Sequence, residues 1–210
     1  MAEAGKAVGF DDLAVLLQRS AAARVLTAIA GPPGAGKSML ADRLAGWLNQ
    51  NAPGSAAVLP MDGYHFDDML LLPRGLRARK GAPETFDVAG LHHMLGRLRR
   101  NEEAEIAVPV FDRQIEIARA GARLIAKSVR HVIVEGNYLL LDRPGWSELR
   151  GLFDITVMVT VPDPVLRERL EQRWAGLSAE ERLTKIEGND LPNGRLVHSK
   201  SLGADFVYTS

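Results

Sequence analysis

Short apolar runs alternate along the chain with segments whose apolar residues recur at helical spacing. The runs indicate buried strands because they are partly β-branched and are bounded by glycine, proline or polar residues; they are Val25–Ala30, 56–61, 132–134, 155–161 and 205–208. Helices are predicted over 10–23, 39–50, 88–100 and 164–174, and Ser178 with Glu181 has the spacing of a capping box that opens a further helix. Strands that alternate with helices predict an α/β fold in which helices cover both faces of a parallel sheet.

One long stretch breaks this alternation. Residues 62–85 are polar, with little regular pattern, and contain the basic cluster Arg74, Arg77, Arg79 and Lys80. A stretch of this length is usually functional or mobile, and a cluster of cations suits small anions such as phosphates. Further along, 107–111 is expected to be a short extended piece.

Composition narrows the class of protein. The 210 residues are 46% apolar, which suits one domain with a sizeable core, and 26 basic residues balance 26 acidic ones. This balance gives no support to nucleic acid or an anionic membrane as the main partner, and no apolar run approaches the roughly 20 residues that a membrane helix needs. The chain has no cysteine, which excludes disulfides, thiolate metal sites and cysteine nucleophiles and fits a cytoplasmic protein.

The glycine-rich run after the first strand has the spacing G-x-x-x-x-G-K-[ST] of a phosphate-binding loop. Glycines allow backbone N–H groups to turn inward around phosphate oxygens, and the helix that follows adds its positive N-terminal end. Lys37 is expected to reach the β- and γ-phosphates of ATP, and the Ser38 hydroxyl to be a ligand of Mg²⁺. The predicted nucleotide-binding residues are Gly31, Pro32, Pro33, Gly34, Ala35, Gly36, Lys37, Ser38 and Met39.

Two carboxylates follow apolar strands. Asp62 comes directly after 56–61, and Glu135 after 132–134. We expect Asp62 to orient the acceptor hydroxyl and take its proton, and Glu135 to hold the water shell of Mg²⁺, so that Ser38, Glu135 and Asp62 surround the metal. Both acids precede a glycine, and an Asp-Gly pair is also a common turn signal.

Basic residues gather in the helix after Pro164. Arg169 and Arg173 share a face at a spacing of four residues. Such a helix is a device by which a kinase lid covers the phosphates and neutralises their charge, although a solvated face with local ion pairs has the same pattern. The chain is therefore predicted to be one P-loop kinase domain over 1–210, with a leading helix in 1–23, an acceptor-side loop over 62–86 and a lid over 163–187.

The chain resembles the uridine kinase, pantothenate kinase and phosphoribulokinase group of P-loop kinases. The resemblance rests on Gly31–Ser38, 61–65, 79–87 and 134–136, in the family's order, and 74–81 and 188–194 resemble a bacterial branch labelled putative fructose transport system kinases. It implies that Asp62 is the catalytic base and that the acceptor lies near Tyr64, His65, Arg79, Lys80, Phe86, Asp112 and Arg113. It also implies that 189–195 is a loop flanking the adenine, with Asn189, Asn193 and Arg195 as nucleotide contacts.

Several functions stay open on the sequence. The first is transfer of phosphate from ATP-Mg²⁺ to a hydroxyl of a small molecule such as a sugar or a vitamin-like acid. A nucleoside is also considered, although the uridine kinase pattern of the acceptor pocket is not clearly reproduced, and the basic cluster would suit a nucleoside monophosphate. A different class of protein would use ATP as a switch without an acceptor, and the oligomeric state, with a homodimer among the options, is open.

Overall fold

The computed structural model describes residues 5–210. Its strands are β1 (Lys6–Ala7), β2 (Val25–Ala30), β3 (Ala56–Pro60), β4 (Glu105–Asp112), β5 (Ile117–Ala126), β6 (His131–Gly136), β7 (Ile155–Thr160) and β8 (Phe206–Thr209). Its α-helices are α1 (Phe10–Arg19), α2 (Lys37–Asn51), α3 (Asp68–Leu71), α4 (Val88–Arg100), α5 (Asp163–Arg173), α6 (Ala179–Lys185) and α7 (Leu191–Lys200). The predicted positions of the main strands and helices are confirmed, with ends that shift by a few residues.

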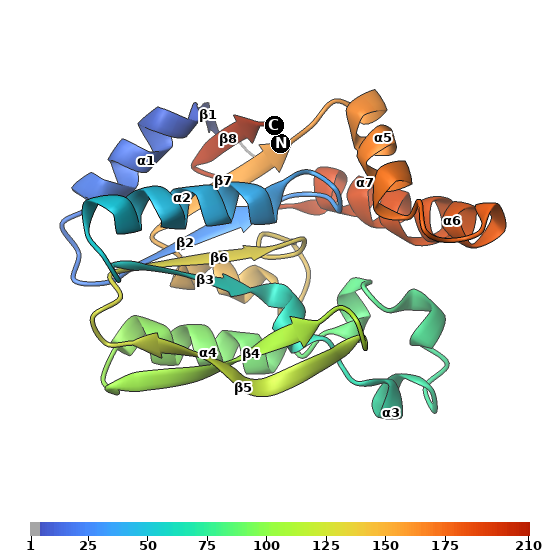
Figure 1. The fold of residues 1–210 in the computed structure, drawn as a ribbon, viewed down its shortest axis with the longest axis horizontal. Coiled ribbons are helices and arrows are strands. Elements are labelled where there is room, and N and C mark those ends of the chain that lie inside the picture. Colours follow the sequence, from blue (N-terminus) through green and yellow to red (C-terminus); the bar gives the residue numbers. More distant parts are fainter. Residues whose placement is uncertain (1–4) are drawn as a thin grey trace.

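The central sheet has the strand order β1-β8-β7-β2-β6-β3, and every neighbouring pair is parallel. β2 and β6 are buried along their whole length, as expected for strands covered on both faces. Helices α1 and α2 lie on one face, and α4 lies on the other (Figure 1). Each face has its own core: Leu13, Leu40 and Leu44 pack on Ile29 and Ile133 on the first, and Leu91 and Leu95 belong to the second.

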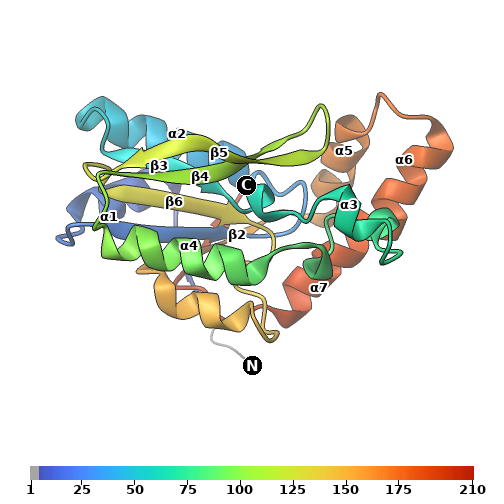
Figure 2. The same ribbon diagram turned by 90° about the horizontal axis from the view of Figure 1, so that it is seen from below.

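The sequence prediction missed two strands, β1 and β5. The predicted extended piece at 107–111 is confirmed as part of β4, which forms an antiparallel hairpin with β5 beside β3 and α4 (Figure 2). β5 was missed because nine of its ten residues are not buried and its sequence, rich in alanine and arginine, has no apolar alternation. The two-residue β1, which pairs with β8, was also missed, and only residues 1–4 of the leading segment lie outside the described part of the chain.

The segment 189–195 is helical rather than a loop. A π-helical turn, Ile186–Asp190, leads directly into α7, which begins at Leu191 and carries Pro192 in its first turn. Proline is tolerated there because the first N–H groups of a helix have no intrahelical partner. The capping box at Ser178 and Glu181 is confirmed, and it begins α6. None of the helices within residues 5–210 has the length and apolar character needed to cross a bilayer.

Candidate functional site

The phosphate loop joins β2 to α2. Gly34 and Gly36 have φ angles of 81° and 89°, a region that side chains with a Cβ avoid, so the turn requires glycine at these positions. α2 begins at Lys37, and its N-terminal N–H groups therefore face the loop. The Lys37 ammonium donates to the Pro32 carbonyl at 2.9 Å. A ready anion-binding concavity is the result.

Lys37 and Glu135 are buried charges at the carboxyl edge of the sheet. Burial lowers the pKa of Lys37, while the nearby Glu135 and Asp62 carboxylates act in the opposite direction. Burial raises the pKa of Glu135, and Lys37 and Ser38 oppose that rise. Two buried charges that shift each other's pKa are typical of functional sites, because neither charge is fully compensated before a ligand binds.

The register of the sheet brings the two acids together. Glu135 pairs with Ile29 of β2 on one side and with Pro60 of β3 on the other. Asp62 lies two residues beyond Pro60, in a 3₁₀ turn over Met61–Tyr64. The Asp62 side chain is 23% exposed and accepts a hydrogen bond from Arg113 at 2.6 Å. The Asp62 carboxylate therefore faces the phosphate loop from the end of β3, the strand next to β6.

An aromatic stack lies next to Asp62. The His65 ring is 4.0 Å from Phe86 and 4.6 Å from Phe111, centroid to centroid. His65 Nδ1 is 2.8 Å from the backbone oxygen of Asp62. Burial lowers the pKa of His65, so the ring is neutral near pH 7. This stack gives the cleft a wall that is flat and uncharged.

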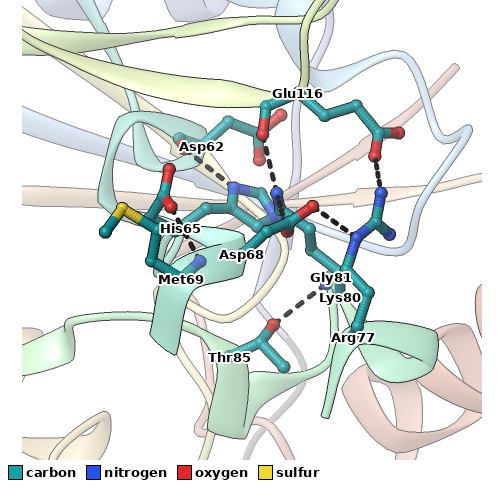
Figure 3. A network of polar contacts seen from close by, with 10 residues as sticks. Asp62, His65, Asp68, Met69, Arg77, Lys80, Gly81, Thr85 and Glu116 are labelled. Atoms are coloured by element: carbon teal, nitrogen blue, oxygen red, sulfur yellow. Dashed lines mark hydrogen bonds and ion pairs between the residues drawn. The ribbon is translucent and has the colours of Figure 1, made fainter. Parts of the chain in front are cut away.

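A polar network lies beyond the aromatic stack (Figure 3). Arg77 binds Asp68 at 2.5 Å and Glu116 at 2.6 Å. Lys80 binds Asp68 at 2.7 Å and donates to the backbone oxygen of Glu116 at 2.6 Å. The network joins α3 and the nearby segment before Gly81 to the turn of the β4–β5 hairpin, which is distant in sequence, so that these segments form one wall.

The opposite wall comes from α5 and the segment that follows it. Arg169 donates to the Ser210 hydroxyl at 2.6 Å, and that hydroxyl donates to the Ala35 carbonyl of the phosphate loop at 2.8 Å. Arg173 and Lys185 lie 5.1 and 5.3 Å from the Trp174 ring, both as cation–π contacts. This wall therefore presents cations to the cleft.

Trp174 is itself tied to the π-helical turn. Its indole donates to Asp190 at 2.7 Å, and burial raises the pKa of that carboxyl although Trp174, Arg173 and Lys185 oppose the rise. Asn189 donates to the Lys80 carbonyl at 3.4 Å and accepts from Asn193. Asn189 thus links this wall to the segment of Lys80, and π-helical turns are frequent at functional sites.

One cleft of about 560 Å³ collects most of the predicted residues. They come from the phosphate loop and its helix, the two strand ends, the polar stretch and the predicted lid: Pro33, Gly34, Gly36, Lys37, Ser38, Met39, Asp62, His65, Lys80, Phe86, Arg113, Glu135, Arg169, Arg173, Asn189 and Asn193. A cleft of this size suits a nucleotide or other small ligand.

Seven predicted residues do not line the cleft. Gly31, Pro32 and Ala35 belong to the phosphate loop but are not lining residues, although the Pro32 carbonyl holds Lys37. Tyr64 is buried in the core, and Arg195 is exposed on α7. Arg79 pairs with Glu84, and Asp112 pairs with Arg119, so both are engaged outside the cleft.

The cleft also contains residues that the sequence did not reveal as site residues: Gly81, Phe111, Glu116, Gly136, Asn137, Trp174, Lys185 and Asp190. Arg77 had been noted only as one member of the basic cluster. Glu116 lies between Ile115 and Ile117 and carried no signal of its own, because its φ of 53° and its contact with Arg77 depend on the hairpin. Trp174 and Lys185 reach the cleft through tertiary packing that no local pattern encodes.

No protein-family model matches the chain. A Schizosaccharomyces pombe protein named "Putative uridine kinase C227.14" is 33% identical, with the match covering 88% of this chain and 82% of that protein. A solved structure described as a "putative fructose transport system kinase" from Silicibacter sp. TM1040 is 42% identical, covers 93% of this chain and 98% of that one, and has a TM-score of 0.83. The Saccharomyces cerevisiae protein YFH7, described as a "putative P-loop containing kinase", has a TM-score of 0.85 over 97% of this chain and 99% of that one; at 19% identity it shows the fold alone.

The fold prediction is confirmed by these structures together with the parallel sheet and its glycine-rich loop. The predicted family is confirmed as well, because the relatives match over most of both chains. The chain belongs to the uridine kinase-like family of P-loop kinases.

Proposed function

We propose that this protein transfers the γ-phosphate of ATP to a hydroxyl group of a small molecule. The observation that carries the proposal is the convergence of Lys37, Glu135 and Asp62 on one cleft, with Asp62 at the end of the strand next to Glu135. A protein that used ATP only as a switch would have no need of a carboxylate poised opposite the phosphate loop. The aromatic stack and polar wall beyond Asp62 leave room for an acceptor.

Donor binding is assigned to the loop 31–38 and the first turn of α2. Its backbone N–H groups and Lys37 would hold the phosphates, while Arg169 and Arg173 would neutralise charge on the transferring group from the opposite wall. Arg169 is already positioned by the Ser210 hydroxyl next to the loop. Asn189 and Asn193 line the same cleft and would contact the nucleotide.

The residues around Lys37 fit Mg²⁺ as the companion of ATP. Within residues 5–210 no group of three or more His, Asp or Glu side chains could hold a metal alone. Mg²⁺ suits such a site because it keeps several waters and binds one or two protein oxygens together with substrate phosphates. The Ser38 hydroxyl, the buried Glu135 carboxylate and, from the other strand, Asp62 are the proposed oxygens. The ion would supply charge neutralisation between the phosphates.

Asp62 is proposed as the base. Its carboxylate would accept a hydrogen bond from the acceptor hydroxyl, orient that oxygen toward the γ-phosphorus and take its proton as the new P–O bond forms and the bond to ADP breaks. Arg113 holds Asp62 at 2.6 Å, and its side chain is 61% exposed, so an entering acceptor can displace it at small cost. A sugar such as fructose is the first candidate acceptor, because a relative carries that name; pantothenate and nucleosides are the alternatives.

The substitution Asp62→Asn tests this assignment. It keeps the size of the side chain but removes the base, so turnover should fall by about 10³-fold, within the range seen for general-base catalysis. ATP affinity, measured by calorimetry, should stay within about twofold, because the phosphate loop, Lys37 and the Ser38 and Glu135 oxygens are unchanged and the amide keeps an oxygen toward Mg²⁺. Asp163→Asn, on the first turn of α5 outside the cleft, is the matched control. Unchanged turnover in Asp62→Asn would remove Asp62 from the mechanism.

A further inference from the structure

Cations at the two ends of the cleft differ in how they are paired. Within the described residues, Lys37, Arg169 and Arg173 at the donor end and Lys185 beside them form no ion pair with a carboxylate. At the acceptor end, Arg77, Lys80 and Arg113 are each paired. Cations that have no carboxylate in direct contact therefore lie where the phosphates of ATP would lie.

At the acceptor end, Asp68 and Glu116 each contact both Arg77 and Lys80. Asp68 accepts from both Arg77 and Lys80, and Glu116 accepts from both through its carboxylate and its backbone oxygen (Figure 3). Burial alone would raise the pKa of Asp68, but the hydrogen bonds from Lys80 and Arg77 outweigh it and hold the pKa below its ordinary value. The Lys80 side chain is only 6% exposed, so its ammonium is committed to this network.

Charge at this end of the cleft therefore cancels. Three cations, Arg77, Lys80 and Arg113, face three carboxylates, those of Asp62, Asp68 and Glu116. An anionic acceptor would have to separate one of these pairs and would leave a carboxylate close to its own negative charge. Breaking a pair that includes the buried Lys80 is costly, because the remaining charge loses its partner where water cannot replace it.

The geometry points to an uncharged, polyhydroxylated acceptor, with Asp68 and Glu116 setting this specificity by neutralising Arg77 and Lys80; the inference rests on the proposed kinase function. Arg77 has N–H groups beyond the two that bind Asp68 and Glu116, and these can donate to hydroxyl oxygens. The stack of His65, Phe86 and Phe111 offers flat apolar surface to the C–H groups of such a molecule. In the sequence, the basic cluster suited a phosphorylated acceptor. In this arrangement Arg77 and Lys80 instead bind carboxylates, and Arg77 can donate to hydroxyl oxygens.

The charge claim can be tested without knowing the acceptor. Inorganic sulfate is titrated by calorimetry into the protein already saturated with Mg²⁺ and a non-hydrolysable ATP analogue, so that the donor end is occupied. The wild-type protein should bind sulfate no more tightly than about 10 mM. Asp68→Asn removes the carboxylate that pairs with Arg77 and Lys80, and Glu116→Gln removes a carboxylate that pairs with Arg77, so each should strengthen sulfate binding at least about tenfold.

Two further variants complete this titration. Glu103→Gln removes the carboxylate of an exposed pair with Arg97, outside the cleft, and should leave sulfate binding as in the wild type. Thermal denaturation verifies that each variant is folded. Sulfate binding to the wild type in the submillimolar range, abolished by Arg77→Gln, would overturn the inference, and so would the absence of any gain in both folded acceptor-end variants.

Matched acceptors test the same inference through catalysis. The pairs are fructose and fructose 6-phosphate, uridine and its monophosphate, and panthenol and pantothenate, which differ mainly in charge. The uncharged member of any pair that is phosphorylated should be preferred in kcat/KM by about 100-fold or more. Preference for an anionic member would contradict the inference. If ATP binds but no member is phosphorylated, the proposed function fails on this panel, and the sulfate titration still decides the charge claim.

Discussion

The donor and acceptor ends of the cleft are built in different ways. The phosphate loop of the donor end is a continuous run, Gly31–Ser38, whose conformation follows from glycines and from a helix that starts at Lys37. The acceptor end consists of side chains from α3, the segment around Lys80 and the β4–β5 turn, held by an ion pair and a backbone hydrogen bond that span 39 and 36 residues of sequence. Local substitutions should therefore disable the donor end outright, whereas the acceptor end should respond to changes in how its segments pack.

Lys37→Ala should have the largest effect on donor binding. The substitution removes a buried charge that would contact the phosphates, and charge-assisted hydrogen bonds contribute up to about 3 kcal/mol, so ATP affinity should fall about 100-fold. Calorimetry with ATP-Mg²⁺ measures the loss. Lys127→Ala, on the surface after β5, is the control and should bind normally. Wild-type affinity in Lys37→Ala would refute the phosphate-loop assignment.

Gly63→Ala should disturb the acceptor end alone. A Cβ at Gly63 would lie 2.7 Å from the Pro109 carbonyl of β4, so the turn that carries Asp62 must shift. A displacement of about 1 Å can cost about 100-fold in rate, so we expect turnover to fall by about 10- to 100-fold while ATP affinity is retained. Gly46→Ala, in α2 with nothing near the added Cβ, should leave both unchanged. Equal loss of ATP binding and turnover in Gly63→Ala would show that the two ends are not separable.

The pH dependence of ATP binding should be smaller and should come from the donor end. Burial lowers the pKa of Lys37 to about 8 in the free protein, and bound phosphates should raise it again. Above about pH 8 the free lysine loses its proton, so ATP binding should take up a proton and affinity should fall by up to about tenfold per pH unit. Calorimetry in two buffers of different ionisation enthalpy measures the uptake.

A substitution that keeps the charge sharpens this measurement. In Lys37→Arg the guanidinium stays protonated throughout the range, so proton uptake should disappear even if affinity is reduced. Affinity of the wild type that is independent of pH between about 7.5 and 9.5, without proton uptake, would contradict the lowered pKa of Lys37.

The contrast between local and long-range structure also explains which parts of the fold and the site could be predicted from the sequence. Burial and spacing at β2, β6 and α4 are local properties, and the elements were predicted with their order and parallel arrangement. The phosphate loop and Asp62 were found because each directly follows an apolar strand. β5 was not, since its alanines and arginines carry no alternation of apolar and polar residues.

Residues of the acceptor wall show the limit of that approach. Arg79 and Lys80 are neighbours of the same type, yet Arg79 turns to Glu84 outside the cleft, whereas Lys80 is buried against Asp68. Which of them faces the cleft depends on a 3₁₀ turn over Arg77–Arg79 and on a hairpin whose tip lies more than 30 residues away. Trp174 likewise reaches the cleft because Asp190, in the π-helical turn, holds its indole.

The central claim is that phosphate passes from ATP to an acceptor hydroxyl held at Asp62. Its most direct test is ³¹P NMR of the protein with ATP-Mg²⁺ and, in turn, fructose, uridine and panthenol. We predict a phosphate monoester signal with at least one of these acceptors, formed in equal amount to ADP and absent in Asp62→Asn. Accumulation of orthophosphate alone, or binding of ATP with no consumption in any of the three reactions, would contradict the account.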